Sequence, residues 1–428
     1  MTDAMQLKKA TYHLYTFLIS KMVGTLGSNV YAFGMSMYIL SMTGSAFSFA
    51  ANMIFSIVPR TILSPIAGVI GDRIPRKVLV IAGQLGEALS ISGLLVYTDL
   101  FGLSVPAIYC TTLIYTVFAT FSGIAFTASV SNLVDTERIQ KAMSFNQLSY
   151  SIAGIGGPIV GGMLFGFVSM SMFLVVNIIA LLITTALEAT MNFNLFKKEA
   201  TVQQKERMID SMKEGWRYVK TKPIVKSILL TALWVNLFFS CISVGGNFIL
   251  LETLKMAPQH IGFIEGAGAV GMLVASIYFA TRSNVKNPLL FAKRSILTLS
   301  VLISVFAIPL FISMTYMTNL VYYTLAMTLF GAFGVMTNTP ISVLFQTAVD
   351  EAYRGRVIGL LEMMAMGLMP IGMVVYGLLF DFVPAEYLFI GSSLLLIPVI
   401  NMCINRKVLD QVAKPDSLQQ EELNEKMA

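Results

Sequence analysis

The longest stretch without a charged side chain lies between Arg294 and Asp350 and contains 55 residues. As one α-helix it would be about 80 Å long, because the rise is about 1.5 Å per residue, whereas the hydrocarbon core of a bilayer is about 30 Å thick. Such a segment must cross a membrane, turn and cross again. Similar apolar runs, separated by charges and by Gly, Pro or Asn, follow one another along the whole chain.

These runs predict an all-α membrane protein with twelve transmembrane helices. Charged residues make up only 12% of the chain, against roughly 25% in soluble domains, which excludes a soluble globular, disordered or coiled-coil protein. The first run has no convincing cleavage site after it, so we expect a spanning helix rather than a signal peptide. The expected spans are 14–40, 46–70, 78–98, 106–129, 143–165, 168–190, 226–251, 260–281, 291–313, 319–345, 357–382 and 386–405.

The basic residues predict the orientation of these spans. With twelve spans, 26 of the 29 Lys and Arg residues fall on the side that holds both termini. Lys255 falls on the other side, and Lys21 and Arg60 fall within spans. The positive-inside rule therefore places the N- and C-termini in the cytoplasm. Because these charges serve as topological anchors, the net charge of +6 gives no reason to expect a nucleic-acid partner.

The longest polar stretch divides the expected spans into two groups of six. We expect an N-terminal six-helix bundle at 1–190, a cytoplasmic linker at 191–225, a C-terminal six-helix bundle at 226–405 and a cytoplasmic tail at 406–428. Within the linker, apolar residues from Met208 to Val219 have helical spacing. They predict an amphipathic helix, either on the headgroup layer or as a solvated connection.

Equivalent loops recur in the two halves. Val134-Asp135 opens the loop after the fourth expected span, and Val349-Asp350 opens the loop after the tenth, at an offset of 215 residues. This offset predicts two pseudo-symmetric bundles. Internal repeats of this kind form the two rocking halves of many secondary transporters.

A glycine-rich and basic motif, Gly68-Val69-Ile70-Gly71-Asp72-Arg73-Ile74-Pro75-Arg76-Lys77, lies between the second and third spans. It resembles the loop signature of the major facilitator superfamily, and the resemblance implies a twelve-helix transporter. It also implies a conformational switch loop in which the Asp72 carboxylate contacts the opposite bundle in the outward-open state. The positive end of the helix near Gly355-Arg356 would favour that carboxylate by about 0.3–1 kcal/mol. Alternatively, the basic residues only anchor the loop inside. The implied switch residues are Gly68, Gly71, Asp72, Arg73, Arg76 and Lys77.

The fifth span contains the run Gly157-Pro158-Ile159-Val160-Gly161-Gly162. It resembles the fifth-helix signature of drug–proton antiporters in this superfamily, which implies a hinge at Gly157, Pro158, Gly161 and Gly162. Small residues and proline also suit a close helix interface without any role in coupling. The stretches NLVDTERIQKAMSFNQ, EGWRYVKTKPIVKSILL and DEAYRGRVIGL resemble the macrolide-efflux and enterobactin-exporter branch.

Many drug–proton antiporters carry an arginine in the fourth span, but the residues around Gly123 include no basic side chain. A charge within the bilayer is costly and predicts a function. Arg60 and Glu87 lie at similar depths in consecutive antiparallel spans, so we expect either a static ion pair or a pair in which Glu87 exchanges protons. Two further candidates for charge coupling are Glu362, near a gate, and Glu265, as an outward proton exit, although an interfacial location explains Glu265 with less assumption.

Lys21 lies about seven residues into the first span, where its ammonium can snorkel to the cytoplasmic surface. Superfamily architecture implies a substrate cavity between the first, fourth, seventh and tenth spans. An amide there can orient a ligand or bond to another helix. The candidate cavity residues are Asn29, Phe33, Tyr115, Phe118, Asn236, Phe239 and Asn338.

We therefore expect a secondary active exporter of a small amphipathic compound, drug-like or macrolide-like, that works by alternating access and proton antiport. The alternatives are a dedicated exporter of a siderophore or similar metabolite and a membrane receptor or scaffold. Nucleotide-binding, hydrolytic and metal-ligand motifs are absent from the sequence, so we expect neither an enzyme nor a cofactor or metal. The expected setting is the bacterial plasma membrane, with the protein as a monomer.

Overall fold

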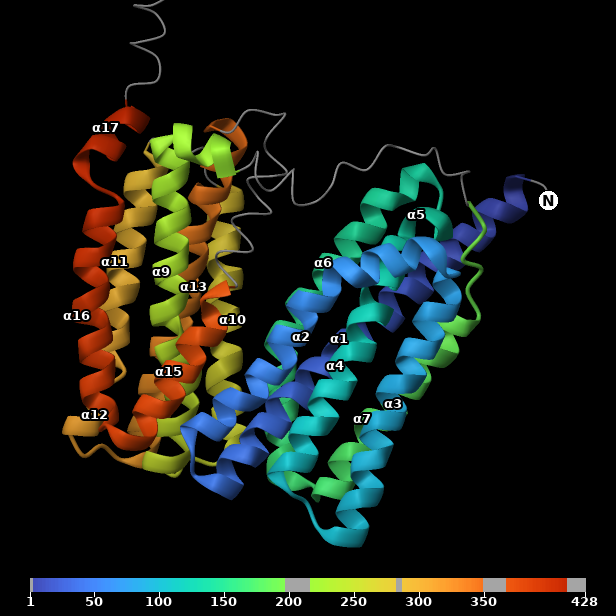
Figure 1. Cartoon of the computed structure of the whole chain (residues 1–428), viewed down its shortest axis with the longest axis horizontal. Coiled ribbons are helices and arrows are strands. Elements are labelled where there is room, and N and C mark those ends of the chain that lie inside the picture. The colour runs from blue at the N-terminus through green and yellow to red at the C-terminus, as the bar shows by residue number, and fades with distance from the viewer. Residues whose placement is uncertain (1–2, 197–215, 282–286, 349–366, 414–428) are drawn as a thin grey trace, which may run out of the picture. The chain divides into compact units, whose positions relative to one another are not determined.

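The computed structural model describes residues 3–196, 216–281, 287–348 and 367–413, and every regular element in these ranges is helical (Figure 1). The chain forms two compact units. Unit 1 contains Met1–Val202 and Leu250–Gly266, and unit 2 contains Gln203–Ile249 and Ala267–Ala428.

Unit 1 is built mainly from the first seven helices. In it, α1 packs along α6, α3 packs on α4 and α7, and α2 packs on α4. Its core includes Tyr31, Ile91, Tyr115 and Phe173, which are buried where α1, α3, α4 and α7 meet. The helices are α1 (Asp3–Thr43), α2 (Ala46–Arg73), α3 (Arg76–Phe101), α4 (Val105–Ala128), α5 (Val130–Leu133), α6 (Thr136–Phe167), α7 (Met170–Ala189) and the first part of α10 (Pro258–Thr281).

Unit 2 has its own apolar core. Its α9 packs on α15 and α16, and α11 packs on α13 and α16. At its C-terminal end α9 continues as a π-helix over Ile249–Thr253. The helices are α9 (Pro223–Phe248), the rest of α10, α11 (Pro288–Val305), α12 (Ile308–Phe311), α13 (Tyr316–Ala348), α15 (Met369–Phe382), α16 (Ala385–Cys403) and α17 (Arg406–Ala413).

Within the described residues, 10 helical segments are long and apolar enough to cross a membrane, and they match ten of the expected spans. The expected span 14–40 lies in α1, which is not among the ten because its Ser, Thr, Asn and Lys side chains lower its hydropathy. Of the expected span 357–382, only Met369–Phe382 is described. The structure thus establishes an all-helical, multi-spanning protein, and the count of twelve stays a prediction.

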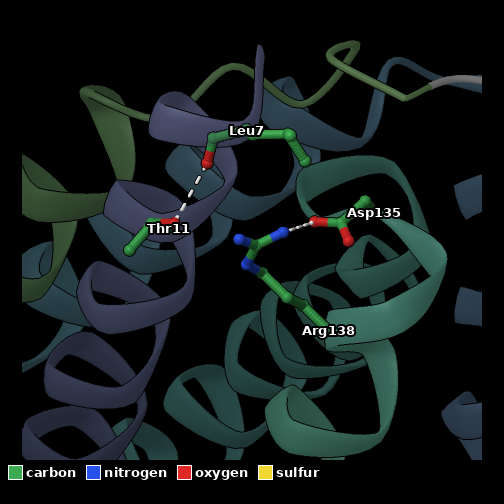
Figure 2. A network of polar contacts seen from close by, with 4 residues as sticks. All are labelled: Leu7, Thr11, Asp135 and Arg138. Carbon is green, nitrogen blue, oxygen red and sulfur yellow. Dashed lines mark hydrogen bonds and ion pairs between the residues drawn. The ribbon is translucent and has the colours of Figure 1, made fainter. Parts of the chain in front are cut away.

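Local signals explain where the helices of unit 1 begin. Ser45 Oγ caps α2 by accepting a hydrogen bond from Ser48 N, at 3.1 Å. Asp135 precedes α6, and its Oδ1 lies 2.5 Å from Nη1 of Arg138 in the first turn (Figure 2). The same view shows α1 beside this pair, with the Thr11 hydroxyl bonded to the carbonyl of Leu7, a turn earlier in the same helix. Val134-Asp135 of the predicted repeat is thus the start of α6, whereas Val349-Asp350 lies outside the described residues.

Only the end of the expected amphipathic linker helix is described. Residues 216–221 are helical, and Trp216 is exposed. Tyr218 and Val219 are buried in the core of unit 2 with Ile228 and Val408. This end of the linker therefore packs against α9 and α17, and the earlier part lies outside the described residues.

Candidate functional site

A polar cavity of about 260 Å³ lies inside unit 1. Helices α1, α2, α3, α4, α6 and α7 all contribute to its wall. The polar face of α1 forms one side of it, which is why α1 is less apolar than the other long helices. Two basic and two acidic side chains line the cavity: Lys21, Arg60, Glu87 and Glu188.

Glu87, in the middle of α3, is only 4% exposed. Its Oε1 accepts a hydrogen bond from Ser122 Oγ of α4, at 2.6 Å. The two helices approach closely because α3 has glycines at the contact. A Cβ at Gly83 would lie 2.7 Å from Ser122 Cβ, and one at Gly86 would lie 2.4 Å from the Phe118 ring. The glycines thus bring a hydroxyl to a carboxylate that burial would otherwise leave poorly satisfied.

Glu188, at the end of α7, is a second buried carboxylate and is 1% exposed. Its Oε1 accepts from Ser20 Oγ of α1, and its Oε2 accepts from Gln84 Nε2 of α3, at 2.8 Å. Glu188 is not among the site residues predicted from the sequence, because a charge at the end of an apolar run also marks a span boundary. Its one distinguishing signal is that it is acidic at the end of the spans where the sequence predicts mostly basic charges.

Lys21 lies with these carboxylates. Its Nζ donates to Thr127 Oγ1 of α4, at 3.4 Å, and lies 5.2 Å from the Tyr150 ring centroid. The side chain is only 8% exposed, so the expectation that its ammonium snorkels to the surface is wrong. Hydroxyl and aromatic groups on neighbouring helices replace the water that it would find there.

Arg60 and Glu87 line the same cavity, but within the described ranges they form no ion pair at or below 4.0 Å. Arg60 is exposed and also borders a second cavity of about 390 Å³, together with Thr120 and Tyr150. The spacing of residues in the sequence gives the depth of a side chain along its helix but not the direction in which it points around the helix axis. Glu87 faces α4, and the expected pair does not form.

The basic residues of the expected switch loop anchor helix ends. Arg76 Nη1 donates to the carbonyl of Ala128 at the end of α4. Lys77 Nζ donates to the carbonyl of Ala189, the last residue of α7, and to that of Met191, two residues beyond it, at 2.7 and 3.1 Å. These carbonyls have no partner within their own helices, and cations there also oppose the negative end of the helix dipole.

The rest of the switch motif remains a prediction. Arg73 is exposed. A Cβ would meet nothing within 4 Å at Gly68, and at Gly71 only Leu79 Cδ1, at 4.0 Å. The Asp72 side chain and residues 349–366, including Gly355-Arg356, are outside what the structure describes.

The glycines of α6 serve two close helix contacts. A Cβ at Gly157 would lie 2.5 Å from Asn29 Cβ of α1, and one at Gly161 would lie 3.1 Å from Phe33 Cδ1. On another face, a Cβ at Gly162 would lie 2.7 Å from the Pro258 carbonyl oxygen of α10. A Cβ at Gly262 of α10 would lie 2.2 Å from the Pro158 carbonyl oxygen. Small residues therefore permit this packing, and a hinge remains a prediction.

The expected substrate-cavity residues separate into three groups. Asn29 and Tyr115 line the cavity, where Ser28 Oγ and the Tyr115 hydroxyl lie 2.8 Å apart. Phe33 and Phe118 instead pack against helix glycines. The members in unit 2 are Asn236, which donates to Ala232 O at 2.9 Å, Phe239, whose ring centroid lies 5.1 Å from that of Phe330, and the exposed Asn338.

The two further candidates for charge coupling are Glu265 and Glu362. Glu265 is half-buried on α10. Glu362 is outside the described residues. Glu265 does not contribute to the cavity wall of unit 1.

A family model described as "Transmembrane secretion effector" matches residues 7–427. The chain belongs to this family of major facilitator superfamily transporters. It is similar to macrolide efflux protein A of Streptococcus pyogenes, with 22% identity over 404 residues that cover 94% of the chain and 97% of the relative. It is also similar to the enterobactin exporter EntS of Shigella flexneri, with 23% identity over 304 residues that cover 69% and 67%.

Solved structures show the same fold. A bacterial metal transporter matches with a TM-score of 0.66 and 17% identity, covering 92% of this chain and 99% of that one. At this identity the match shows a common fold and nothing about function. The family and its relatives establish a multi-pass transporter of the plasma membrane with a small-molecule substrate, and they are transporters rather than enzymes.

Proposed function

We propose that the chain is a secondary active exporter of a small amphipathic compound, working by alternating access in exchange for protons. In this proposal twelve helices form two six-helix bundles, 1–190 and 226–405, with the linker and both termini in the cytoplasm. The export direction is supported by the similarity to macrolide efflux protein A.

The observation that carries the proposal is a pair of buried carboxylates beside a cavity within membrane-spanning helices. Glu87 is 4% exposed and Glu188 is 1% exposed, and both line the cavity. A buried charge in a membrane is costly and marks ion or substrate pathways. Neither carboxylate forms an ion pair at or below 4.0 Å within the described ranges, so each can lower its cost by taking a proton.

Glu87 is the proposed proton carrier, since its hydrogen bond from Ser122 supports the charged form without neutralising it. Proton entry from the outside and release to the cytoplasm would then drive the substrate outward. The loop containing Asp72 would bias which side is open, and the α6 segment from Gly157 to Gly162 would flex between the states.

The test is macrolide uptake into inverted membrane vesicles with an imposed pH gradient. We expect Glu87→Gln to lower gradient-driven uptake at least about tenfold, because it removes a proton site while keeping the shape of the side chain. Glu137→Gln, at an exposed acid in the first turn of α6, is the matched control and should retain coupling. Full coupling in Glu87→Gln would eliminate Glu87 as the proton carrier, and uptake that ignores the gradient in the wild type would eliminate proton antiport.

A second candidate, a dedicated metabolite exporter, is favoured by the similarity to the enterobactin exporter. It predicts that deleting the gene causes one metabolite to accumulate inside the cell, with little change in drug sensitivity. Comparing the metabolites of deletion and wild-type cells separates the two candidates.

A further inference from the structure

A second cavity of about 390 Å³ adjoins the first in unit 1, and its wall carries a different charge. The residues common to both walls are Arg60, Ala119, Thr120, Gly123 and Tyr150. Ile124, Thr127 and Ala128 complete the second wall, whereas Glu87 and Glu188 line only the first cavity. Among the described residues, Arg60 is therefore the only one with a formal charge in the wall of the second cavity.

Arg60 lies inside the membrane-spanning part of α2, eight residues before that span ends at Gly68. This separation is about 12 Å along the helix. The guanidinium forms no hydrogen bond, and no ion pair at or below 4.0 Å, with the described part of the chain. A charge within the bilayer is costly and marks a pathway for ions or substrate. Because the side chain is exposed and lines both cavities, its N–H donors can serve a ligand.

The other polar groups of the second cavity differ in whether they can donate. Thr120 Oγ1 donates to the carbonyl of Thr116, at 2.7 Å, and Thr127 Oγ1 donates to that of Gly123, at 2.9 Å. Each threonine has thus used its only hydroxyl proton. The Tyr150 side chain is 40% exposed, and its hydroxyl forms no hydrogen bond within the described ranges. A ligand in this cavity therefore meets two free kinds of donor, the guanidinium and the phenol.

The surroundings of these donors favour an anion with an apolar body. Lys21 Nζ lies 5.2 Å from the Tyr150 ring centroid, so a second positive charge stands behind the phenol. Ala119, Ile124 and Ala128 give the cavity an apolar surface. Small-molecule sites combine an apolar lining of this kind with a few convergent polar groups.

We propose that the second cavity binds the carboxylate of an amphipathic substrate, with the Arg60 guanidinium and the Tyr150 hydroxyl as its donors. The inference rests on the proposed exporter function and adds a substrate class to it. The planar fork of a guanidinium matches the two oxygens of a carboxylate. A carboxamide of the same shape has one acceptor oxygen and no charge, so it gains much less from this fork.

The test compares two fluorescent probes, dansyl-aminohexanoate and its primary amide, which differ only in the terminal carboxylate or carboxamide. Their binding to the full chain in phosphatidylcholine nanodiscs is measured at neutral pH without a gradient, and binding to empty nanodiscs is subtracted. We expect the carboxylate to bind about tenfold tighter than the amide, which corresponds to one charge-assisted hydrogen bond. Equal binding of the two probes, tighter binding of the amide, or no binding of either would overturn the proposal.

Variants assign the preference to its donors. Arg60→Met should abolish it, and Tyr150→Phe should reduce it about threefold, because a neutral donor contributes less than a charged one. Lys141→Met is the matched control, since it removes an exposed cation of α6 that lines neither cavity, and it should keep the preference. If Arg60→Met does not fold, Tyr150→Phe still decides. A preference that survives both substitutions would refute the site.

A phospholipid phosphate is an anion that could reach the same guanidinium. Replacing part of the phosphatidylcholine with phosphatidylglycerol separates the two sources. We expect the preference of the wild type for the carboxylate probe to persist. Its loss in the presence of phosphatidylglycerol would assign Arg60 to lipid phosphate and overturn the substrate proposal.

The outcome is separable from that of the exporter proposal. If macrolide uptake follows the pH gradient while the carboxylate probe has no advantage, the carboxylate site is wrong and the exporter stands. If the carboxylate is preferred through Arg60 while no gradient drives uptake, the site stands and the exporter is wrong.

Discussion

Replacing Gly157 of α6 with alanine tests whether α1 and α6 are held together by backbone-level contact. The new Cβ would lie 2.5 Å from Asn29 Cβ, 3.4 Å from Asn29 C and 3.5 Å from its Cα. These atoms belong to α1 itself rather than to the end of a flexible side chain. To restore ordinary carbon–carbon contact, the two helices must separate locally by about 1 Å.

Overpacking of this kind costs about 1–3 kcal/mol. Alanine also favours a helix over glycine by about 1 kcal/mol, which partly hides that cost. Gly154, on the same helix, is the matched control, because a Cβ there meets nothing within 4 Å. The propensity gain is common to both variants, so the free energy of unfolding of Gly157→Ala should be about 1–3 kcal/mol below that of Gly154→Ala.

The assay is equilibrium unfolding of the purified chain in mixed detergent micelles, followed by circular dichroism. We expect Gly154→Ala to be unchanged or slightly more stable than the wild type, and Gly157→Ala to be less stable than Gly154→Ala. Equal stability of the two variants would show that α1 and α6 are not in close contact at Gly157.

Two further predictions use the same assay. Lys77→Met should lower the free energy of unfolding by about 1 kcal/mol, because it removes the donor to two carbonyls at or just after the end of α7. The exposed Arg73 provides the control. An equal loss of stability in Arg73→Met would contradict the anchoring role of Lys77. Burial, and to a smaller extent Lys9 and Lys77, lower the pKa of His13 below its usual 6.5. The unfolded chain therefore binds more protons near that pH, so stability should fall as the pH drops below about 6.5, and this slope should be weaker in His13→Gln.

Much of the fold could be predicted because a bilayer imposes a simple rule. Long apolar runs located ten of the spans, and the gap between Arg294 and Asp350 correctly required two crossings. Glu87 could be singled out from the sequence because a charge in the middle of a span is costly and uncommon. The same rule explains the miss at Glu188, where a charge at the end of a run looks like the membrane boundary.

Contacts between helices were harder to predict than the helices themselves. The ion pair of Arg60 with Glu87 was inferred from depth, but Gly83 and Gly86 bring α4 close to α3 and give Glu87 a serine partner. Lys21 was expected at the surface because no sequence rule indicates that Thr127 and Tyr150 lie beside it. Such contacts depend on the rotation of each helix about its axis. The sequence pattern indicates this rotation only weakly when a helix is apolar on most of its faces.

The polar face of α1 has a consequence for biogenesis. α1 leaves the ribosome well before α6, along which it packs, because α6 begins 93 residues after α1 ends. At about 5–20 residues per second, α1 waits about 5–20 s for that helix. Meanwhile Lys21 faces lipid or the translocon at a cost of about 2.5–3.5 kcal/mol if near the bilayer centre. We therefore expect α1 to be inserted less stably until α6 emerges, and truncation before α6 should leave α1 poorly integrated.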